Sequence, residues 1–371
     1  MPQRIILVSN TSWSFYKFRM GLIKRFIEDG HEVFLLSPRD EHVNHLEDTG
    51  AKFVELKQMS AKGVNPISDI KCYKELKQIL AHLKPDIIFH YTIKPNIYCS
   101  LIASSLQIRS VGIVTGLGYT FINKGIVPFI GRLLYRFSLS KSDEVWFLNS
   151  EDLKTMVTKG IVPKHKTSIL NGEGIDTKRF APSNKLNRNN NEFLFVGRIL
   201  YDKGIKEYYE AARELKKEFP LIKISVLGYL HDENPMAVNR IEFDQWVNNG
   251  FIHYYGSKED VREYMLSCSC VVLPSYREGL SMVLLEAASM GCPIITSNIA
   301  GCKEVVDDSE TGFLTRVRDS KDLAEKMKKF YLLSISEKLN MGIRARNRVQ
   351  NIFSIEQAYN KYKLSLVNQL Q

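Results

Sequence analysis

The stretch FLFVGRILYDKGIKE (residues 193–207) decides the fold class, because an apolar run ends at Gly197 and a polar turn then leads into a helical segment. Apolar runs of the same kind, each followed by a helical stretch, occupy residues 4–10, 32–38 and 86–92 in the first half and 223–229, 251–256, 268–275 and 293–298 in the second. Repeated strand-helix-strand units are typical of a mostly parallel, doubly wound sheet. We therefore predict an α/β protein with two doubly wound, Rossmann-like domains in series.

A polar segment separates the two sets of apolar runs. Residues 183–191, SNKLNRNNN, show no hydrophobic period, which is typical of a linker between domains. Because ligands of doubly wound domains bind at the carboxyl ends of the strands, the two domains are predicted to face each other across a cleft. The predicted division is an N-terminal domain over residues 1–182, a linker over 183–192, a C-terminal domain over 193–352, and a last helix over 353–371 that packs back on the N-terminal domain.

The net charge of +10 lies entirely in residues 1–190, since Lys and Arg balance Asp and Glu in the remainder. A basic half favours an anionic partner, either nucleic acid, a phosphorylated substrate or an acidic membrane surface. No helix-turn-helix, RNP-like or zinc pattern supports nucleic-acid binding. The six cysteines form no CxxC pair, and no apolar run is long enough to span a bilayer. We expect a cytoplasmic protein, or one bound peripherally to the cytoplasmic face of the inner membrane.

The sharpest motif is SYREGLSMVLLEAASMG (residues 275–291). It follows an apolar run, places Glu278 in a loop and carries a second carboxylate, Glu286, on the helix that follows. A helix start favours phosphate, and two carboxylates can accept hydroxyl hydrogen bonds from a sugar and a ribose. The alternative is a capped surface helix with two unrelated glutamates. The predicted diphosphate site uses the backbone amides of Gly279, Leu280 and Ser281.

A second motif lies just after Gly197, where Arg198 and Lys203 follow the end of a strand. Two fixed cations suit a departing nucleoside diphosphate, because negative charge grows on its bridging oxygen as the sugar bond breaks. A solvated Arg and Lys at a turn is the alternative. No D-x-D triplet occurs in the sequence, so we predict that the cations replace a bridging metal and that neither metal nor cofactor is needed.

These motifs together resemble the glycosyltransferase family 4 enzymes of the GT-B fold. GRxxxxKG precedes the Glu278 motif by about eighty residues, and NGEGIDTKRF (residues 171–180) resembles a third element of that family. The N-terminal segments 9–19, 90–98 and 115–122 resemble a subgroup that extends undecaprenyl-diphosphate-linked saccharides in bacterial surface-polysaccharide or glycoprotein synthesis. The resemblance implies a retaining glycosyltransferase with a nucleotide-sugar donor, favouring a UDP-linked hexose or N-acetylhexosamine, and a lipid-diphosphate-linked saccharide acceptor.

The resemblance also implies roles for individual residues. Arg198 and Lys203 are expected to contact the donor diphosphate, Glu278 the hydroxyls of the transferred sugar, and Glu286 the ribose. Many relatives place a histidine near the anomeric carbon, but the corresponding loop here, residues 115–122, has none. His90 is the nearest candidate for that catalytic role, and a structural hydrogen bond is the alternative for a histidine at a strand end. Further expected substrate contacts are Asn171, Gly116, Gly118, Lys94, Lys17 and Arg19.

The segment KGIVPFIGRLLYRFSLSK (residues 124–141) has two possible interpretations. Basic and apolar residues alternate at helical spacing, as in helices that lie in a membrane interface. A core helix with a solvated basic face has the same pattern. The membrane interpretation uses four cations, Lys124, Arg132, Arg136 and Lys141, beside the apolar Phe129, Leu133 and Phe137.

Two enzyme classes compete with the transferase. A nicotinamide oxidoreductase needs G-x-G-x-x-G after its first strand, and residues 9–19 contain no glycine, so that class is excluded. A sugar-nucleotide epimerase of the same GT-B architecture stays as an alternative. An epimerase converts the donor without an acceptor, whereas a transferase needs one.

Overall fold

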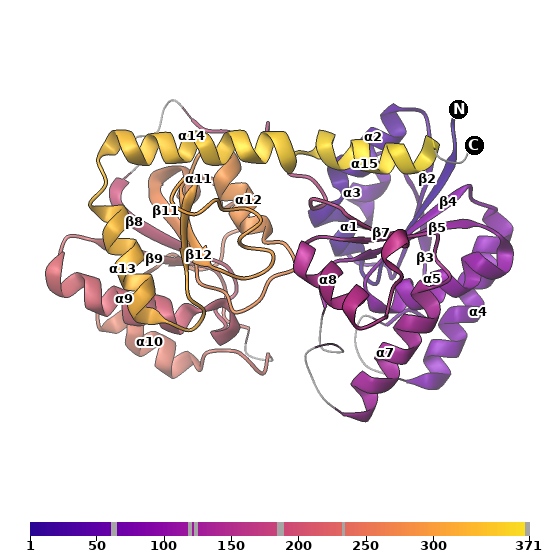
Figure 1. The fold of residues 1–371 in the computed structure, drawn as a ribbon, viewed down its shortest axis with the longest axis horizontal. Coiled ribbons are helices and arrows are strands. Elements are labelled where there is room, and N and C mark those ends of the chain that lie inside the picture. The colour runs from indigo at the N-terminus through magenta and orange to yellow at the C-terminus, as the bar shows by residue number, and fades with distance from the viewer. Residues whose placement is uncertain (61–64, 118–120, 122–124, 184–188, 232–233, 368–371) are drawn as a thin grey trace. The chain divides into compact units, whose positions relative to one another are not determined.

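The computed structural model describes residues 1–60, 65–117, 121, 125–183, 189–231 and 234–367 and divides into two compact units. One unit comprises residues 1–174 and 355–371, and the other comprises residues 175–354. Each has its own parallel sheet covered by helices (Figure 1). The predicted α/β class with two doubly wound domains is confirmed.

The linker prediction needs a correction. Of the predicted linker 183–192, residues 189–192 belong to strand β8 (Asn189–Val196), which pairs with β11 from Asn189 onward. Polar side chains do not prevent this, because backbone groups form the hydrogen bonds between strands. The chain passes between the units at residues 174/175 and 354/355 instead, where Ile175 and Ser354 form a parallel bridge.

The N-terminal unit contains, among its described residues, a seven-stranded parallel sheet in the order β3-β2-β1-β4-β5-β6-β7. Because β1 and β4 are neighbours, the loops that follow them lie together at the carboxyl edge of the sheet, where the direction of winding reverses. The strands are β1 (Arg4–Val8), β2 (Glu32–Ser37), β3 (Lys52–Glu55), β4 (Ile87–Tyr91), β5 (Arg109–Val114), β6 (Glu144–Phe147) and β7 (Thr167–Ile169).

Helices cover both faces of this sheet (Figure 1). Helix starts carry local signals: Asn65 caps α4 with Pro66 in its first turn, and Asn149 caps α8. The last helix belongs to this unit, and its Tyr362 ring lies 4.8 Å from that of Phe89 on β4. The helices are α1 (Ser12–Phe18), α2 (Met20–Glu28), α3 (Val43–Glu47), α4 (Pro66–Leu83), α5 (Ile93–Leu106), α7 (Ile126–Leu139), α8 (Ser150–Thr158) and α15 (Ile355–Val367), with a 3-10 turn η1 (Lys164–Lys166).

The C-terminal unit has a six-stranded parallel sheet, within the described residues, in the order β10-β9-β8-β11-β12-β13. Its strands are β8, β9 (Lys223–Leu227), β10 (His253–Tyr254), β11 (Cys268–Leu273), β12 (Ile294–Ser297) and β13 (Gly312–Thr315). Its helices are α9 (Ile205–Glu218), α10 (Arg240–Asn248), α11 (Arg262–Ser267), α12 (Met282–Ser289), α13 (Ser320–Tyr331) and α14 (Ile335–Ile352), with a 3-10 turn η2 (Tyr201–Lys203).

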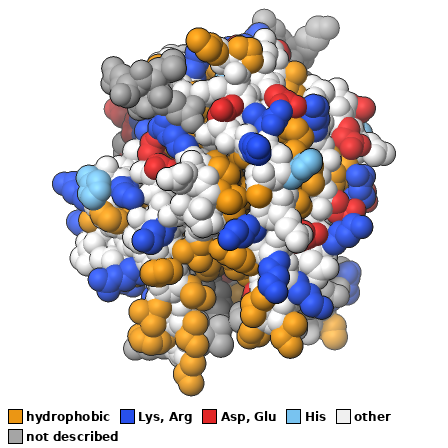
Figure 2. Space-filling model, turned by 90° about the vertical axis from the view of Figure 1, so that its right-hand side faces the viewer, with side chains coloured by type: hydrophobic (Ala, Val, Ile, Leu, Met, Phe, Trp, Pro, Cys, Tyr) orange, Lys and Arg blue, Asp and Glu red, His pale blue; other side chains and the backbone are white. Residues whose placement is uncertain are grey.

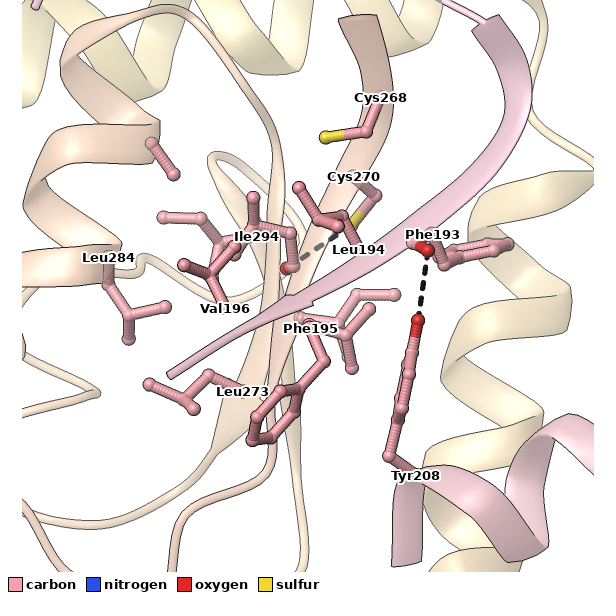
Figure 3. Close-up of a cluster of buried hydrophobic side chains, with 14 of the residues drawn as sticks. Phe193, Leu194, Phe195, Val196, Tyr208, Cys268, Cys270, Leu273, Leu284 and Ile294 are labelled. Carbon is pink, nitrogen blue, oxygen red and sulfur yellow. Dashed lines mark hydrogen bonds between the residues drawn. The ribbon is translucent and has the colours of Figure 1, made fainter. Parts of the chain in front are cut away.

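The core of the C-terminal unit lies between β8, β11 and the surrounding helices (Figure 3). Phe193 and Phe195 of β8 are fully buried, and the hydroxyl of Tyr208 on α9 donates to the Phe193 carbonyl at 2.9 Å. This bond satisfies a polar group inside an apolar core, where an unpaired hydroxyl is costly. The packing fixes α9 against β8 and so fixes the turn between them.

Candidate active site

The two sequence motifs meet at the carboxyl edge of the C-terminal sheet. β8 and β11 are neighbours in the sheet, although α9, β9, α10, β10 and α11 lie between them in sequence. The turn with Arg198 and Lys203 follows β8, and the loop with Glu278 follows β11. Adjacent strands whose connections wind in opposite directions create the usual ligand crevice of an open α/β sheet.

Gly204 brings the two loops into contact. Its φ is +76°, and a Cβ there would lie 2.0 Å from the carbonyl oxygen of Pro274. Only glycine has both the left-handed conformation and the room for this approach. The amide of Tyr276 also donates to the Asp202 carbonyl at 2.8 Å. The turn after β8 is therefore held directly against the loop after β11.

Lys203 and Glu278 form an ion pair as a result. Lys203 Nζ lies 2.6 Å from Glu278 Oε1, and the two side chains are only 17% and 13% exposed. The hydroxyl of the buried Ser275 donates to the same oxygen at 2.8 Å. Both bonds use Oε1, which leaves Oε2 as the oxygen best placed to accept from a ligand. Sequence reasoning missed Ser275, whose position three residues before Glu278 was the available signal.

The predicted anion site needs a correction. The amide of Ser281 donates to the Gly301 carbonyl at 3.0 Å, so it is not an orphan donor. Gly301 packs tightly here, since a Cβ at its φ of +78° would lie 2.7 Å from the carbonyls of Glu278 and Gly279. Helix α12 begins one residue later, at Met282, which places Gly279 and Leu280 in the loop before the helix. Gly301 therefore shapes the loop that the sequence assigned to phosphate binding.

The other predicted donor contacts lie on the same elements. Arg198 is half-buried and, in the part of the chain that the structure describes, forms no ion pair, unlike Lys203. Gly197 directly follows β8 and donates its amide to the Leu227 carbonyl at 3.0 Å. Glu286 lies on α12 with an exposed fraction of 5%. Two cations and two carboxylates thus occupy neighbouring elements of one unit.

Tyr276 adds a contact that the sequence did not reveal. Its hydroxyl donates to Glu207 on α9 at 2.6 Å, and the Arg318 guanidinium lies 4.6 Å from its ring centroid. Burial, together with the bond to Glu207, raises the pKa of Tyr276 well above its ordinary value. The phenol is therefore a neutral donor that ties the Glu278 loop to α9.

His90 does not match the catalytic role that the sequence suggested. It lies on β4, is fully buried, and shares a 2.8 Å hydrogen bond between its Nδ1 and Asn96 Oδ1. The Asn96 amide in turn donates to the Ile113 carbonyl and to the Tyr135 hydroxyl. Burial lowers the pKa of His90 to about 4, so the ring is neutral near pH 7. The structural alternative is the one that the geometry supports.

Arg19 also needs a correction. It is 2% exposed, its guanidinium lies 2.5 Å from Glu173 Oε1, and it stacks 3.7 Å from the Tyr91 ring centroid. The other oxygen of Glu173 accepts from the Tyr362 hydroxyl at 3.2 Å. Arg19 therefore joins α1, the end of β4 and α15 inside the unit, and it has no surface for a substrate phosphate. The sequence could not reveal this, because Glu173 lies far away along the chain.

The remaining predicted acceptor contacts have varied surroundings. Lys94 pairs with Asp69 at 2.8 Å, whereas Lys17 on α1 and Asn171 are exposed. Gly116 has a φ of +150°, a conformation in which glycine is favoured. Gly118 lies outside the described residues, as does Lys124.

Helix α7 exposes its apolar side chains to solvent. Phe129, Leu133 and Phe137 are 56%, 50% and 60% exposed, so these three do not pack in the core. The opposite side of α7 does, since Tyr135 and Leu139 are buried there, as the core-helix interpretation expects. Arg136 is exposed on the same helix, and Arg132 is half-buried. Figure 2 shows one face of the N-terminal unit. Hydrophobic side chains gather at one end of this face, with Lys and Arg side chains beside them. No helix among the described residues is long and apolar enough to cross a bilayer.

Comparison with known proteins identifies the family. The family model described as glycosyl transferases group 1 matches residues 176–348, and the model described as glycosyl transferase 4-like matches residues 4–149. The chain is 30% identical, over 95% of each chain, to the N,N'-diacetylbacillosaminyl-diphospho-undecaprenol alpha-1,3-N-acetylgalactosaminyltransferase of Campylobacter jejuni. It is 26% identical, over 81% of this chain and 80% of the relative, to the UDP-Gal:alpha-D-GlcNAc-diphosphoundecaprenol alpha-1,3-galactosyltransferase of Escherichia coli.

Solved structures agree on the fold. A glycosyltransferase from Rickettsia africae matches with a TM-score of 0.83 at 17% identity, covering 99% of this chain and 98% of that one. Anabaena HepE in complex with UDP and glucose matches with a TM-score of 0.79 at 14% identity, covering 99% and 100%. The chain is therefore a glycosyltransferase of the GT-B fold and belongs to the group 1, family 4-like glycosyltransferases.

Proposed function

We propose that this protein is a retaining, metal-independent glycosyltransferase that transfers a hexose or N-acetylhexosamine from a UDP sugar to an undecaprenyl-diphosphate-linked saccharide in cell-surface polysaccharide or glycan synthesis. The observation that carries the proposal is the Lys203–Glu278 ion pair at the reversal point of the C-terminal sheet, where Lys203 lies in the same segment between β8 and α9 as Arg198. Both relatives named above act on diphospho-undecaprenol saccharides, and one uses a UDP sugar. The UDP complex of HepE adds support for the donor.

The proposed chemistry needs cations at the leaving group. Arg198 and Lys203 neutralise the diphosphate as the bond between its oxygen and the anomeric carbon breaks. The acceptor hydroxyl oxygen bonds to that carbon from the same face, and its proton passes to the departing phosphate oxygen. Glu278 accepts hydrogen bonds from the transferred sugar, and Glu286 from the ribose. No base is required from the N-terminal unit, which is consistent with a buried, neutral His90.

The proposal includes reversible binding to the cytoplasmic face of an anionic membrane. The acceptor's lipid is confined to a bilayer, and α7 presents exposed apolar side chains together with Arg132 and Arg136. Lys141 follows at the end of the helix, and each well-placed cation near an anionic surface contributes about 1 kcal/mol. Sedimentation with phosphatidylglycerol vesicles at low and high salt tests this part. A variant with Gln at the three cations should pellet less than the parent, whereas equal pelleting would contradict it.

A panel of nucleotide sugars, each incubated with synthetic lipid-diphosphate monosaccharides and analysed by mass spectrometry, tests the transfer. We expect one UDP hexose or UDP-N-acetylhexosamine to give a lipid product that is one sugar heavier, with UDP released only when the acceptor is present. Conversion of a donor into another sugar nucleotide without acceptor would instead indicate the epimerase.

A further inference from the structure

An open groove of about 720 Å³ lies beside α7 in the N-terminal unit. The C-terminal half of α7 forms one wall, and the end of α8 with the segment after it forms the other. The volume is within the roughly 300–1,000 Å³ of small-molecule sites. Its apolar lining consists of Leu133, Phe137, Val157, Ile161, Val162 and Pro163.

The groove is not part of the acceptor-sugar site. Helix α7 leads into β6 and α8 leads into β7, so both helices end at the amino edge of the parallel sheet. The segments that follow β1 and β4 lie at the opposite, carboxyl edge, and they include Lys17 on α1 and Lys94 in the first turn of α5. Reactive groups of doubly wound domains gather at the carboxyl edge. We therefore expect any ligand of this groove to be a molecule other than the reacting saccharide.

The polar part of the groove is cationic. Arg136 and Lys164 contribute to its lining, which contains no Asp or Glu among the described residues. The nearby Lys166 Nζ donates to the carbonyls of Ser140 and Ser142 at 2.9 and 2.8 Å. These hydrogen bonds connect the segment after α8 to the segment after α7, and so they hold the two walls of the groove together. An occupant must offer an anionic group and an apolar chain.

We propose that the groove binds one anionic phospholipid of the bilayer, with its phosphate on Arg136 and Lys164 and an acyl chain along the apolar lining. The inference rests on the proposed membrane association. The exposed apolar face of α7 continues into the groove, because Leu133 and Phe137 belong to both. This continuity favours a lipid as the ligand. The cationic rim complements a phosphodiester, and a lipid already in the membrane needs little movement to enter.

Phe129 and Phe137 provide a matched pair for the test. Both are exposed phenylalanines on α7, at 56% and 60%, but only Phe137 lines the groove. The full-length protein is titrated calorimetrically with dioctanoylphosphatidylglycerol below its micelle concentration. We expect Phe137→Glu to weaken binding about tenfold or more, because it places a carboxylate beside the lipid phosphate and in an apolar lining. Phe129→Glu should leave this binding within about twofold while reducing vesicle pelleting.

Companion titrations exclude other ligands. Dioctanoylphosphatidylcholine should bind more weakly than dioctanoylphosphatidylglycerol, and inorganic phosphate, which has no acyl chain, should not displace dioctanoylphosphatidylglycerol at an equal concentration. The inference is overturned if the parent pellets with vesicles but does not bind the monomeric lipid, or if both Phe variants affect that binding equally. It is also overturned if a lipid-diphosphate acceptor displaces the phospholipid, since the groove would then hold substrate. Absence of sugar transfer with intact lipid binding would contradict the proposed function alone.

Discussion

The variant Glu278→Gln tests whether Glu278 contacts the transferred sugar and not the nucleotide. In the free protein Glu278 holds the Lys203 ammonium at 2.6 Å, and both side chains are largely shielded from water. A donor diphosphate must compete with this carboxylate for Lys203. The isosteric change removes the competing charge, keeps the volume, and leaves Ser275 able to bond to the amide oxygen.

The structure sets the expected magnitudes. Loss of one preorganised transition-state contact lowers turnover by about 10²- to 10³-fold. UDP affinity should stay unchanged or rise by a few fold, since the Lys203 ammonium no longer has to give up an ion pair with Glu278 when the diphosphate binds. Hydrogen bonds to charged groups contribute about 1.5–3 kcal/mol, so unfolding free energy should fall by no more than that. By contrast, Glu286→Gln should weaken UDP binding, because that carboxylate is assigned to the ribose.

The assay combines three measurements on each variant: turnover with saturating donor and acceptor, UDP affinity by calorimetry, and urea unfolding. Glu263→Gln is the control, since Glu263 lies exposed on α11 of the same unit. It should match the parent in all three. A loss of UDP affinity in Glu278→Gln that equals the loss in Glu286→Gln would refute the assignment of the two carboxylates.

Three further predictions address charge, acidity and stability. EDTA should leave the rate largely intact, whereas Arg198→Ala or Lys203→Ala should each lower it about 100-fold or more in steady-state kinetics; full loss on chelation, restored by manganese, would contradict this. Because burial lowers the pKa of His90 to about 4, the unfolded chain takes up a proton that the folded protein excludes, and the free energy of unfolding should fall by about 2 kcal/mol from this residue between pH 7 and pH 5. Urea unfolding of His90→Gln should lack that part of the fall, and an unchanged pH dependence would exclude it. Arg19→Met should cost about 3–5 kcal/mol in thermal unfolding, because it leaves a buried carboxylate unpaired, while the exposed Lys17→Met should leave stability unchanged; equal stability of the two would contradict the correction for Arg19.

The features of the fold and the site that depend on local sequence pattern could be predicted. Alternating apolar runs and helical stretches were enough for two doubly wound sheets, and the order of the motifs placed Arg198 and Glu278 after β8 and β11. The sequence could not predict the Lys203–Glu278 pair, which depends on the close approach of Gly204 to the Pro274 carbonyl. One amino-acid sequence gives no information on the distance between two segments that lie far apart along the chain.

The errors share one physical cause. Arg19 was assigned from its place after the first strand and His90 from its place at a strand end, but their surroundings come from other segments, Glu173 for Arg19 and the Asn96–Tyr135 contact for His90. Burial of a charged or titratable side chain is decided by tertiary partners, not by neighbours in sequence. The start of β8 was missed for a similar reason, because pairing with β11 outweighs the polar character of its asparagines.

The anomeric configuration of the product tests the central claim most directly. Purified protein is incubated with the UDP sugar that the donor panel selects and a synthetic lipid-diphosphate saccharide, and the new linkage is determined by NMR. The proposed transfer predicts a single added sugar whose anomeric configuration is that of the donor, with UDP as the other product. An inverted linkage, or a product that forms without release of UDP, would contradict it.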